Sequence, residues 1–192
     1  MNILLLIYNQ KQYPMNNRKL ILYIACSLDG YIAKPNDDLS FLNSVQKEGE
    51  DYGYSSFIST IDTVIIGRKT YDWVINQGIE FPHADKESYI ITRTTKEKEG
   101  NLTFYNGNLP DLVKKLKSKN GKNIFCDGGA EIVHELLKEK LLDEIIISII
   151  PILVGDGIRL FKSDRPEQEL TLLSSKNYDS GLVQLHYKIK TA

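Results

Sequence analysis

The sequence contains very little cysteine: only Cys26 and Cys126 among 192 residues. Neither cysteine belongs to a Cys-x-x-Cys pair, and each lies inside an apolar run, so neither a zinc site nor a redox pair is indicated and we predict no metal. Buried free thiols are typical of proteins in a reducing compartment. We therefore expect a cytoplasmic protein.

The sequence also lacks an excess of charge of either sign. Its 24 Lys and Arg oppose 25 Asp and Glu, giving a formal net charge of -1. Because the two signs are mixed along the chain, we expect no basic surface for nucleic acid or for an anionic membrane. The apolar stretch 1–8 is too short to cross a bilayer and has no basic leading region, so it predicts neither a membrane span nor a signal peptide.

The length and composition favour one domain. The chain is 42% hydrophobic and 26% charged, as expected for an ordinary globular protein, and contains no repeat or linker. Residues 1–17 precede the first convincing strand. We expect a poorly anchored extension over 1–17 and a single domain over 18–192.

Strand-like and helix-like patterns alternate over most of the chain. Apolar, β-branched runs predict strands at 20–26, 63–66, 88–92, 101–105 and 123–126, and helical spacing predicts helices at 51–60, at 69–77, around 109–116 and after Gly129. After Leu142 the strands 144–150, 160–161, 169–175 and 182–190 follow without helices. This order predicts an α/β fold whose mixed sheet has a parallel core and an antiparallel end.

Gly67 lies where a buried strand turns into a helix. A helix start carries unpaired backbone N–H groups and the positive end of the helix dipole. Arg68, Lys69 and Thr70 add two cations and a hydroxyl at this point, which favours an anion site, most naturally one for phosphate. The alternative is an ordinary junction with solvated basic residues.

A second junction of this kind follows Cys126. The sequence Asp127-Gly-Gly-Ala-Glu131 places two glycines between a strand and a helix, where the backbone can approach a ligand closely. A tight turn that needs glycine would explain Gly-Gly alone. Two such junctions in one α/β sheet instead favour an extended dinucleotide, although the spacing differs from the Gly-x-Gly-x-x-Gly fingerprint.

These motifs resemble the dihydrofolate reductase superfamily over residues 19–190. The resemblance is carried by 25–33 with Leu28-Asp29-Gly30, by 66–70, by Ile91-Thr92-Arg93 and by 127–132. The later Pro151-x-x-x-Gly155-x-Gly157 and Leu160-Phe161 are similar to the branch that contains the C-terminal reductase domain of bifunctional riboflavin-biosynthesis enzymes.

The resemblance implies a dihydrofolate-reductase-like sheet, mostly parallel, with flanking helices, a C-terminal antiparallel hairpin and NADPH as the cofactor. It implies phosphate contacts at Gly67, Arg68, Lys69 and Thr70, the adenosine 2′-phosphate at Thr92 and Arg93, the pyrophosphate at Gly128, Gly129, Ala130, Glu131 and Ile132, and the nicotinamide at Ala25 and Ile32. Three cations on two neighbouring loops independently suit NADPH better than NADH.

Two carboxylates are candidate catalytic groups. Asp51 lies where the folate reductases carry the carboxylate that anchors the substrate and supports its protonation, and Asp29 lies in the loop that closes over the nicotinamide. Asp51 could instead be a helix-start charge favoured by the dipole, and Asp29 a turn-forming residue. His83, His134 and His186 lie on a loop, a helix and a strand and are interpreted as structural.

The resemblance predicts an NADPH-dependent reductase of a small heterocycle. The first candidate activity is that of a 5-amino-6-(5-phosphoribosylamino)uracil reductase, the second is dihydrofolate reduction, and the third is nucleotide binding without turnover. The deaminase motifs of the bifunctional riboflavin enzymes are absent, and Arg68-Lys69-Thr70 is closer to the folate reductases. The apolar strand 144–150, expected near a sheet edge, also predicts a homodimer.

Overall fold

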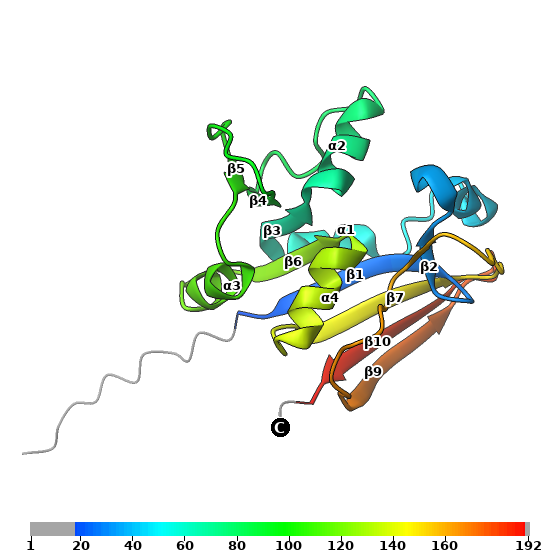
Figure 1. The fold of residues 1–192 in the computed structure, drawn as a ribbon. Helices are drawn as coiled ribbons and strands as arrows, with labels where there is room; N and C mark the ends of the chain where they lie inside the picture. Colours follow the sequence, from blue (N-terminus) through cyan, green and yellow to red (C-terminus); the bar gives the residue numbers. More distant parts are fainter. Residues whose placement is uncertain (1–17, 191–192) are drawn as a thin grey trace, which may run out of the picture.

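The computed structural model describes residues 18–190 (Figure 1). The expected N-terminal extension, residues 1–17, lies outside the described residues. Among the residues described, no helix is long and apolar enough to cross a membrane. The same part of the chain contains no cluster of His, Cys, Asp and Glu that could hold a metal ion.

Strands and helices follow the predicted order closely. The strands are β1 (Leu20–Ser27), β2 (Tyr31–Ala33), β3 (Ile61–Gly67), β4 (Glu87–Ile91), β5 (Leu102–Tyr105), β6 (Asn123–Gly128), β7 (Glu144–Ile150), β8 (Ile158–Arg159), β9 (Leu170–Asn177) and β10 (Val183–Ile189). The helices are η1 (Pro35–Asp37), η2 (Ser40–Val45), α1 (Tyr54–Ser59), α2 (Arg68–Asn76), α3 (Leu109–Lys117) and α4 (Ala130–Lys138), where η denotes a 3₁₀ helix.

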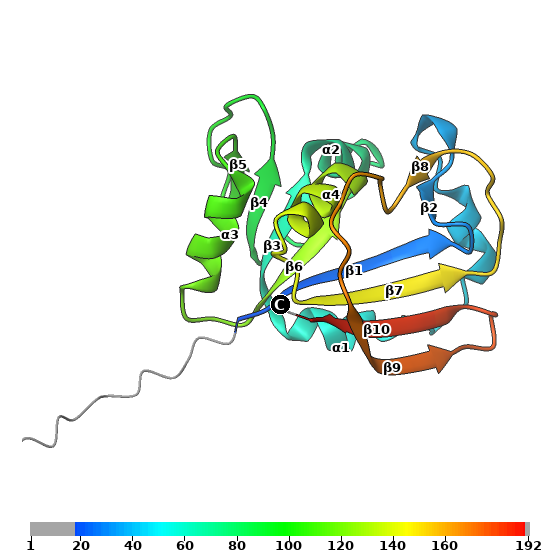
Figure 2. The same ribbon diagram turned by 60° about the horizontal axis from the view of Figure 1, so that its bottom comes forward.

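The described chain folds around one eight-stranded sheet with the order β5-β4-β3-β6-β1-β7-β10-β9. The first six strands in this order, from β5 across to β7, are parallel to their neighbours. β10 is antiparallel to both β7 and β9. The short strands β2 and β8 pair separately. The predicted α/β fold, with its mostly parallel sheet and C-terminal antiparallel hairpin, is confirmed (Figure 2).

Two local predictions were wrong. The strand 144–150 is β7, which is paired with β1 on one side and with β10 on the other and so lies inside the sheet; the edge strand at this end is β9. The strand predicted at 160–161 is formed by Ile158–Arg159 instead. An apolar run predicts a buried strand but does not show which strands pair with it. Here the hairpin of β9 and β10 pairs with β7 and covers what would otherwise be the edge of the sheet.

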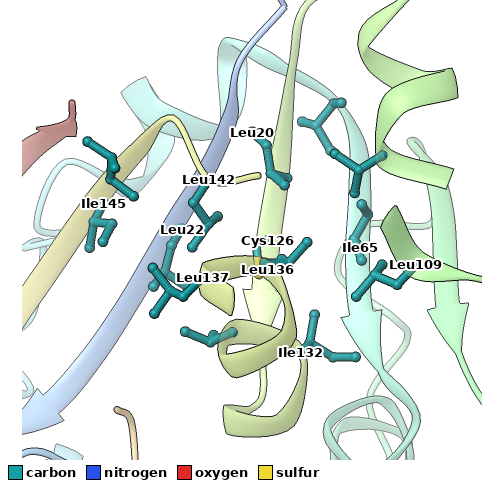
Figure 3. Close-up of a cluster of buried hydrophobic side chains, with 14 of the residues drawn as sticks. Leu20, Leu22, Ile65, Leu109, Cys126, Ile132, Leu136, Leu137, Leu142 and Ile145 are labelled. Atoms are coloured by element: carbon teal, nitrogen blue, oxygen red, sulfur yellow. The ribbon is translucent and has the colours of Figure 1, made fainter. Parts of the chain in front are cut away.

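Helices cover both faces of the sheet and bury its alternating side chains. On one face, α3 and α4 pack Leu112, Leu116, Val133 and Leu136 against Leu20, Leu22, Ile65 and Cys126, and Figure 3 shows α4 directed at these strands. On the other face, α1 packs Phe57 against Ile21, Val64 and Phe125, and α2 packs Tyr71 against Ile66 and Ile90. α2 and α4 begin at the C-terminal ends of β3 and β6, and each helix packs on a different face of the sheet.

Candidate active site

The two glycine junctions meet at one edge of the sheet. β3 and β6 are neighbours, and Ile66 pairs with Gly128. A Cβ atom added at Gly67 would lie 3.4 Å from the carbonyl oxygen of Gly128 and 3.4 Å from the amide nitrogen of Gly129. The two turns therefore converge from adjacent strands, as an extended dinucleotide site requires.

Both helices begin without a side-chain cap. The residues at the N-cap positions are Gly67 for α2 and Gly129 for α4, and neither provides a side-chain acceptor. At α3, by contrast, the Asn108 side chain accepts a hydrogen bond from the amide of Asp111 at 2.9 Å. The first turns of α2 and α4 thus leave N–H groups for an external anion, and phosphate is the natural occupant of two such starts side by side.

Arg68 is oriented by its own helix. Its Nε donates to both carboxylate oxygens of Asp72, at 2.6 and 2.7 Å, and its guanidinium carbon lies 5.6 Å from the centre of the Phe104 ring. Lys69 is exposed. The terminal amino groups of a guanidinium held in this way can still donate to a phosphate.

Thr92 and Arg93 follow β4 directly. Gly67 pairs with Ile91, so the loop after β4 begins beside the start of α2. Arg93 is exposed, and no described side chain forms an ion pair with it. Arg93 on this loop and Arg68 and Lys69 at the start of α2 bring three cations together, which fits the extra phosphate that distinguishes NADPH from NADH.

The residues predicted for the pyrophosphate surround the start of α4. The peptide bond between Gly128 and Gly129 is cis, and a Cβ atom at Gly129 would lie 3.2 Å from Thr70 Oγ1. Ala130 and Ile132 are buried and face the core, whereas the exposed Glu131 forms an ion pair with Lys162. A ligand at the start of α4 can therefore contact the backbone there more readily than the buried side chains of Ala130 and Ile132.

A pocket of about 390 Å³ lies on the face of the sheet that α1 covers. It is enclosed by β1, β7 and the segment from η2 to the start of α1. Its lining consists of Tyr23, Ala25, Leu42, Asn43, Val45, Gln46, Asp51, Tyr52, Tyr54, Ser148, Ile150 and Leu182. A mostly apolar pocket with a few polar groups is the expected form of a small-molecule site.

Of the two positions predicted to face the nicotinamide, Ala25 lines this pocket and Ile32 does not. Ala25 pairs with Ser148 across β1 and β7. Ile32 lies on β2 and packs against the cluster beneath α4. The small side chain of Ala25 leaves space in the pocket for a flat ring.

Asp51 also lines the pocket, and its carboxylate holds the start of α1. It accepts hydrogen bonds from the amides of Gly53, at 2.8 Å, and Ser55, at 3.0 Å. Hydrogen bonds from Ser55 and Gly53 lower the pKa of the Asp51 carboxyl. The carboxylate is thus ionised at neutral pH, where it can accept hydrogen bonds from a ligand but has no proton to give.

Asp29 ties together two loops outside the pocket lining. Its carboxylate accepts hydrogen bonds from Ser27 Oγ at 2.5 Å and from the amides of Val154 and Gly155 at 3.0 and 2.7 Å. The bond from Ser27, followed by that from Val154, lowers the pKa of Asp29 to about 2. Asp29 thus positions the loop that follows β1, and its catalytic role stays a prediction.

Two polar residues that line the pocket, Tyr23 and Ser148, are held by Gln184, and the sequence did not single out any of the three. Gln184 Nε2 donates to Ser148 Oγ at 3.0 Å and to Tyr23 Oη at 3.1 Å. One signal was available for Ser148, which is the single polar residue inside the apolar run Ile145–Ile150. For Gln184 there was none, because only the pairing of β10 with β7 brings it to this place.

The three histidines lie apart from the pocket lining. His83 is buried between the rings of Phe81 and Phe125, with Nε2 3.6 Å from an Asp127 carboxylate oxygen. His186 bonds to Glu144 at 2.9 Å between β10 and β7, on the same face of the sheet as Ser148 but nearer the start of β7. His134 lies on α4. Ring packing accounts for His83, and a hydrogen bond to Glu144 accounts for His186.

Comparison with known proteins places this chain in a family. The family model described as the RibD C-terminal domain matches residues 81–184. The Bacillus subtilis (strain 168) protein YwjB is 42% identical over 171 residues, which cover 88% of this chain and 97% of YwjB. The chain belongs to the RibD C-terminal domain family, the reductase family whose fold is that of dihydrofolate reductase.

Solved structures agree with this assignment. A crystal structure from Shewanella sp. PV-4, of a protein assigned by name to riboflavin biosynthesis, is 30% identical and has a TM-score of 0.83, covering 90% of this chain and 99% of that one. Dihydrofolate reductase from Enterococcus faecalis, solved with NADP(H), is 15% identical with a TM-score of 0.62, covering 90% of this chain and 97% of that one, and shows a likeness of fold alone.

Proposed function

We propose that this protein is an NADPH-dependent reductase of a small heterocycle. The observation that carries the proposal is the convergence of the two uncapped helix starts at Gly67 and Gly129, with Arg93 on the adjacent loop. When bound, NADPH would supply a hydride. The residues from Gly67 to Thr70 and from Gly128 to Ile132 would hold its phosphates, and Thr92 and Arg93 its 2′-phosphate.

The substrate would lie in the pocket lined by Ala25 and Asp51. A Cβ atom added at Gly128 would lie 3.4 Å from Ile24 Cδ1, and Ile24 precedes Ala25 on β1, so a substrate in the pocket would lie next to the nucleotide. The side chains of the pocket would orient the ring and keep water from its reacting face. Family membership favours an aminopyrimidine of the riboflavin type first and dihydrofolate second, and a reaction of this kind would take place in the cytoplasm.

A second candidate function is nucleotide binding without turnover. It is favoured by the state of the two candidate carboxylates, since Asp29 and Asp51 both have lowered pKa values and neither holds a proton at neutral pH. Fold alone does not decide between the two functions. A reductase would then need a proton from water or from the substrate itself.

The test is to bind NADPH and NADH to the purified protein, followed by nucleotide fluorescence, and then to screen aminopyrimidines and pterins for NADPH oxidation. We expect NADPH to bind at least about tenfold more tightly than NADH. Equal affinity for the two nucleotides would contradict the proposal. Tight NADPH binding without oxidation by any compound would favour the second function, and loss of oxidation in Asp51→Asn would support the first.

A further inference from the structure

The pocket beside Ala25 carries almost no charge. Asp51 is the one lining residue with a side chain that is charged at neutral pH, and no Lys or Arg is among the described residues that line it. The remaining lining is aliphatic, aromatic, amide or hydroxyl. An anionic ligand would therefore meet a carboxylate and no cation in this pocket.

Two lysines close to the pocket face negative or aromatic groups, and the charge of one of them, Lys176, already acts on the Asp51 carboxylate. A neighbouring hollow of about 150 Å³ contains Lys47, which forms a 3.2 Å ion pair with Asp179, and Lys176, which lies 4.3 Å from the centre of the Tyr178 ring. Glu50 lines the same hollow, so its two lysines face two carboxylates. This hollow offers no net positive charge that could attract a phosphate.

Tyr52 forms the wall between the pocket and this hollow. Its hydroxyl is held by the carbonyl of Val45 and lies 3.0 Å from Ser180 Oγ. Its carbonyl accepts hydrogen bonds from Tyr23 Oη at 3.0 Å and from Gln184 Nε2 at 3.1 Å. Because hydrogen bonds hold both its hydroxyl and its backbone carbonyl, Tyr52 is poorly placed to move aside for a phosphate on a bound ligand.

The lining of the pocket presents a hydrogen-bond donor. Ser148 Oγ accepts from Gln184 Nε2 at 3.0 Å, and no described residue accepts the hydroxyl proton of Ser148. Tyr23, by contrast, donates its proton to the Tyr52 carbonyl. Since Ser148 is 5% exposed and lines the pocket, an acceptor on a ligand is the natural partner for its hydroxyl.

We infer that the pocket takes an unphosphorylated, neutral or cationic nitrogen heterocycle, which presents N–H groups to Asp51 and a carbonyl-type acceptor to Ser148. The inference rests on the proposed function for its choice of this pocket as the substrate site. A phosphate dianion in this pocket would be repelled by the Asp51 carboxylate, and no Lys or Arg among the described lining residues would compensate. Among the family's candidate substrates, the unphosphorylated ones are therefore favoured.

The test uses a matched pair of ligands, 5-amino-6-(ribosylamino)uracil and its 5′-phosphate, titrated calorimetrically into the full chain with and without NADPH. We expect the unphosphorylated compound to bind at least about tenfold more tightly in both conditions. Equal affinity, preference for the phosphate, or no binding of either compound would overturn the inference. Failure of NADPH to bind would contradict the proposed function while the ratio of the two ligand affinities could still be measured.

Substitutions at Ser148 and at Asp51 test the two proposed ligand contacts separately. Ser148→Ala should weaken the unphosphorylated ligand about tenfold, because it removes the donor, whereas Ser174→Ala on the exposed strand β9 should not change its affinity. Asp51→Asn should bring the affinities for the unphosphorylated and the phosphorylated ligand closer together. Asp111→Asn on α3 is its control and should leave their ratio unchanged. Unchanged ligand binding in Ser148→Ala and unchanged discrimination in a folded Asp51→Asn would overturn the proposed contacts.

Discussion

Ile66 of β3 and Gly128 of β6 lie opposite each other in the parallel sheet, so the chain leaves both strands at the same level and starts a helix from each. A Cβ atom added at Gly67 would lie 3.3 Å from Ile132 Cγ1 and 3.4 Å from the backbone of Gly128. Ile132 is in the first turn of α4. This contact couples the starts of the two helices.

We expect Gly67→Ala to raise the Kd for NADPH about tenfold while the protein stays folded. Alanine can adopt the φ of -71° at this position, so the effect comes from the added methyl group, which displaces the start of α4 by a few tenths of an ångström. The measurement is NADPH titration together with thermal unfolding. Gly78→Ala is the control: it strains the backbone at a φ of 72° in open space and should lower stability by about 1 kcal/mol without changing the Kd.

The loop after β4 should determine the preference for NADPH over NADH. Arg93→Ala removes an exposed cation two residues beyond the partner of Gly67, and we expect it to weaken NADPH about tenfold or more and NADH little. Lys114→Ala, which removes a cation from the exposed face of α3, should leave both affinities unchanged. Equal weakening of both nucleotides by Arg93→Ala would show that Arg93 does not contact the 2′-phosphate.

Asp29 should make stability depend on pH in the acid range. Its pKa is lowered to about 2, from a value near 3.8, by the hydrogen bond from Ser27 first and by that from the amide of Val154 next. The stabilisation is therefore fully present above pH 4 and is lost as the pH falls from about 4 to about 2. We expect Asp29→Asn to unfold at lower urea than the wild type at pH 7, and this difference to shrink over that range.

The control for this prediction is Glu139→Gln, at the exposed end of α4, which should shift the unfolding midpoint little at any pH. A difference between Asp29→Asn and the wild type that stayed constant down to pH 2 would show that the carboxylate is not stabilised by its charge. The loop that follows β1 would then be held by other contacts, such as the hydrogen bond from Leu28 to Ile152.

The fold and the nucleotide junctions could be predicted because each depends on local sequence. A strand, a glycine and a helix start are adjacent in the chain at Gly67 and again at Gly128, and the alternation of strands and helices implies that the strands are parallel. The hydrogen bonds that hold the lining of the pocket could not be predicted in this way. Tyr23 and Gln184 are 161 residues apart and meet only because β10 pairs with β7.

The sequence also could not predict the hydrogen-bond partners that lower the pKa of Asp29, because they come from a distant part of the chain. The sequence places Asp29 beside a glycine, but its partners, Val154 and Gly155, come from a loop more than a hundred residues later. A Cβ atom at Gly157 would lie 2.1 Å from the Ala33 carbonyl oxygen, so only glycine allows this loop to pack so closely on β2. Long-range contacts of this kind decide whether an acid titrates normally, and a single sequence does not contain them.

Both cysteines should behave as inert buried thiols. Burial raises the pKa of Cys26 to about 11 and that of Cys126 to about 12, so roughly one thiol in a thousand or fewer is ionised at pH 8. Leu22 pairs with Cys126, which puts Cys26 four residues along β1, roughly 13 Å away and too far for a disulfide. A thiol reagent should find two reactive groups in guanidinium and almost none in the native protein. Rapid labelling of the native chain would contradict this burial.

The edge of the sheet is where a second copy of the chain would bind. β9 is exposed along its whole length, and Leu170, Leu172 and Leu173 are 44%, 51% and 47% exposed. An edge strand with apolar side chains favours pairing with another edge, so we expect light scattering to give the mass of a homodimer. Leu172→Lys should give the monomer mass, and Leu153→Lys, which adds the same charge at a 71% exposed loop position, should remain dimeric. A monomeric wild type would refute the prediction, and a dimeric Leu172→Lys would place the interface elsewhere than β9.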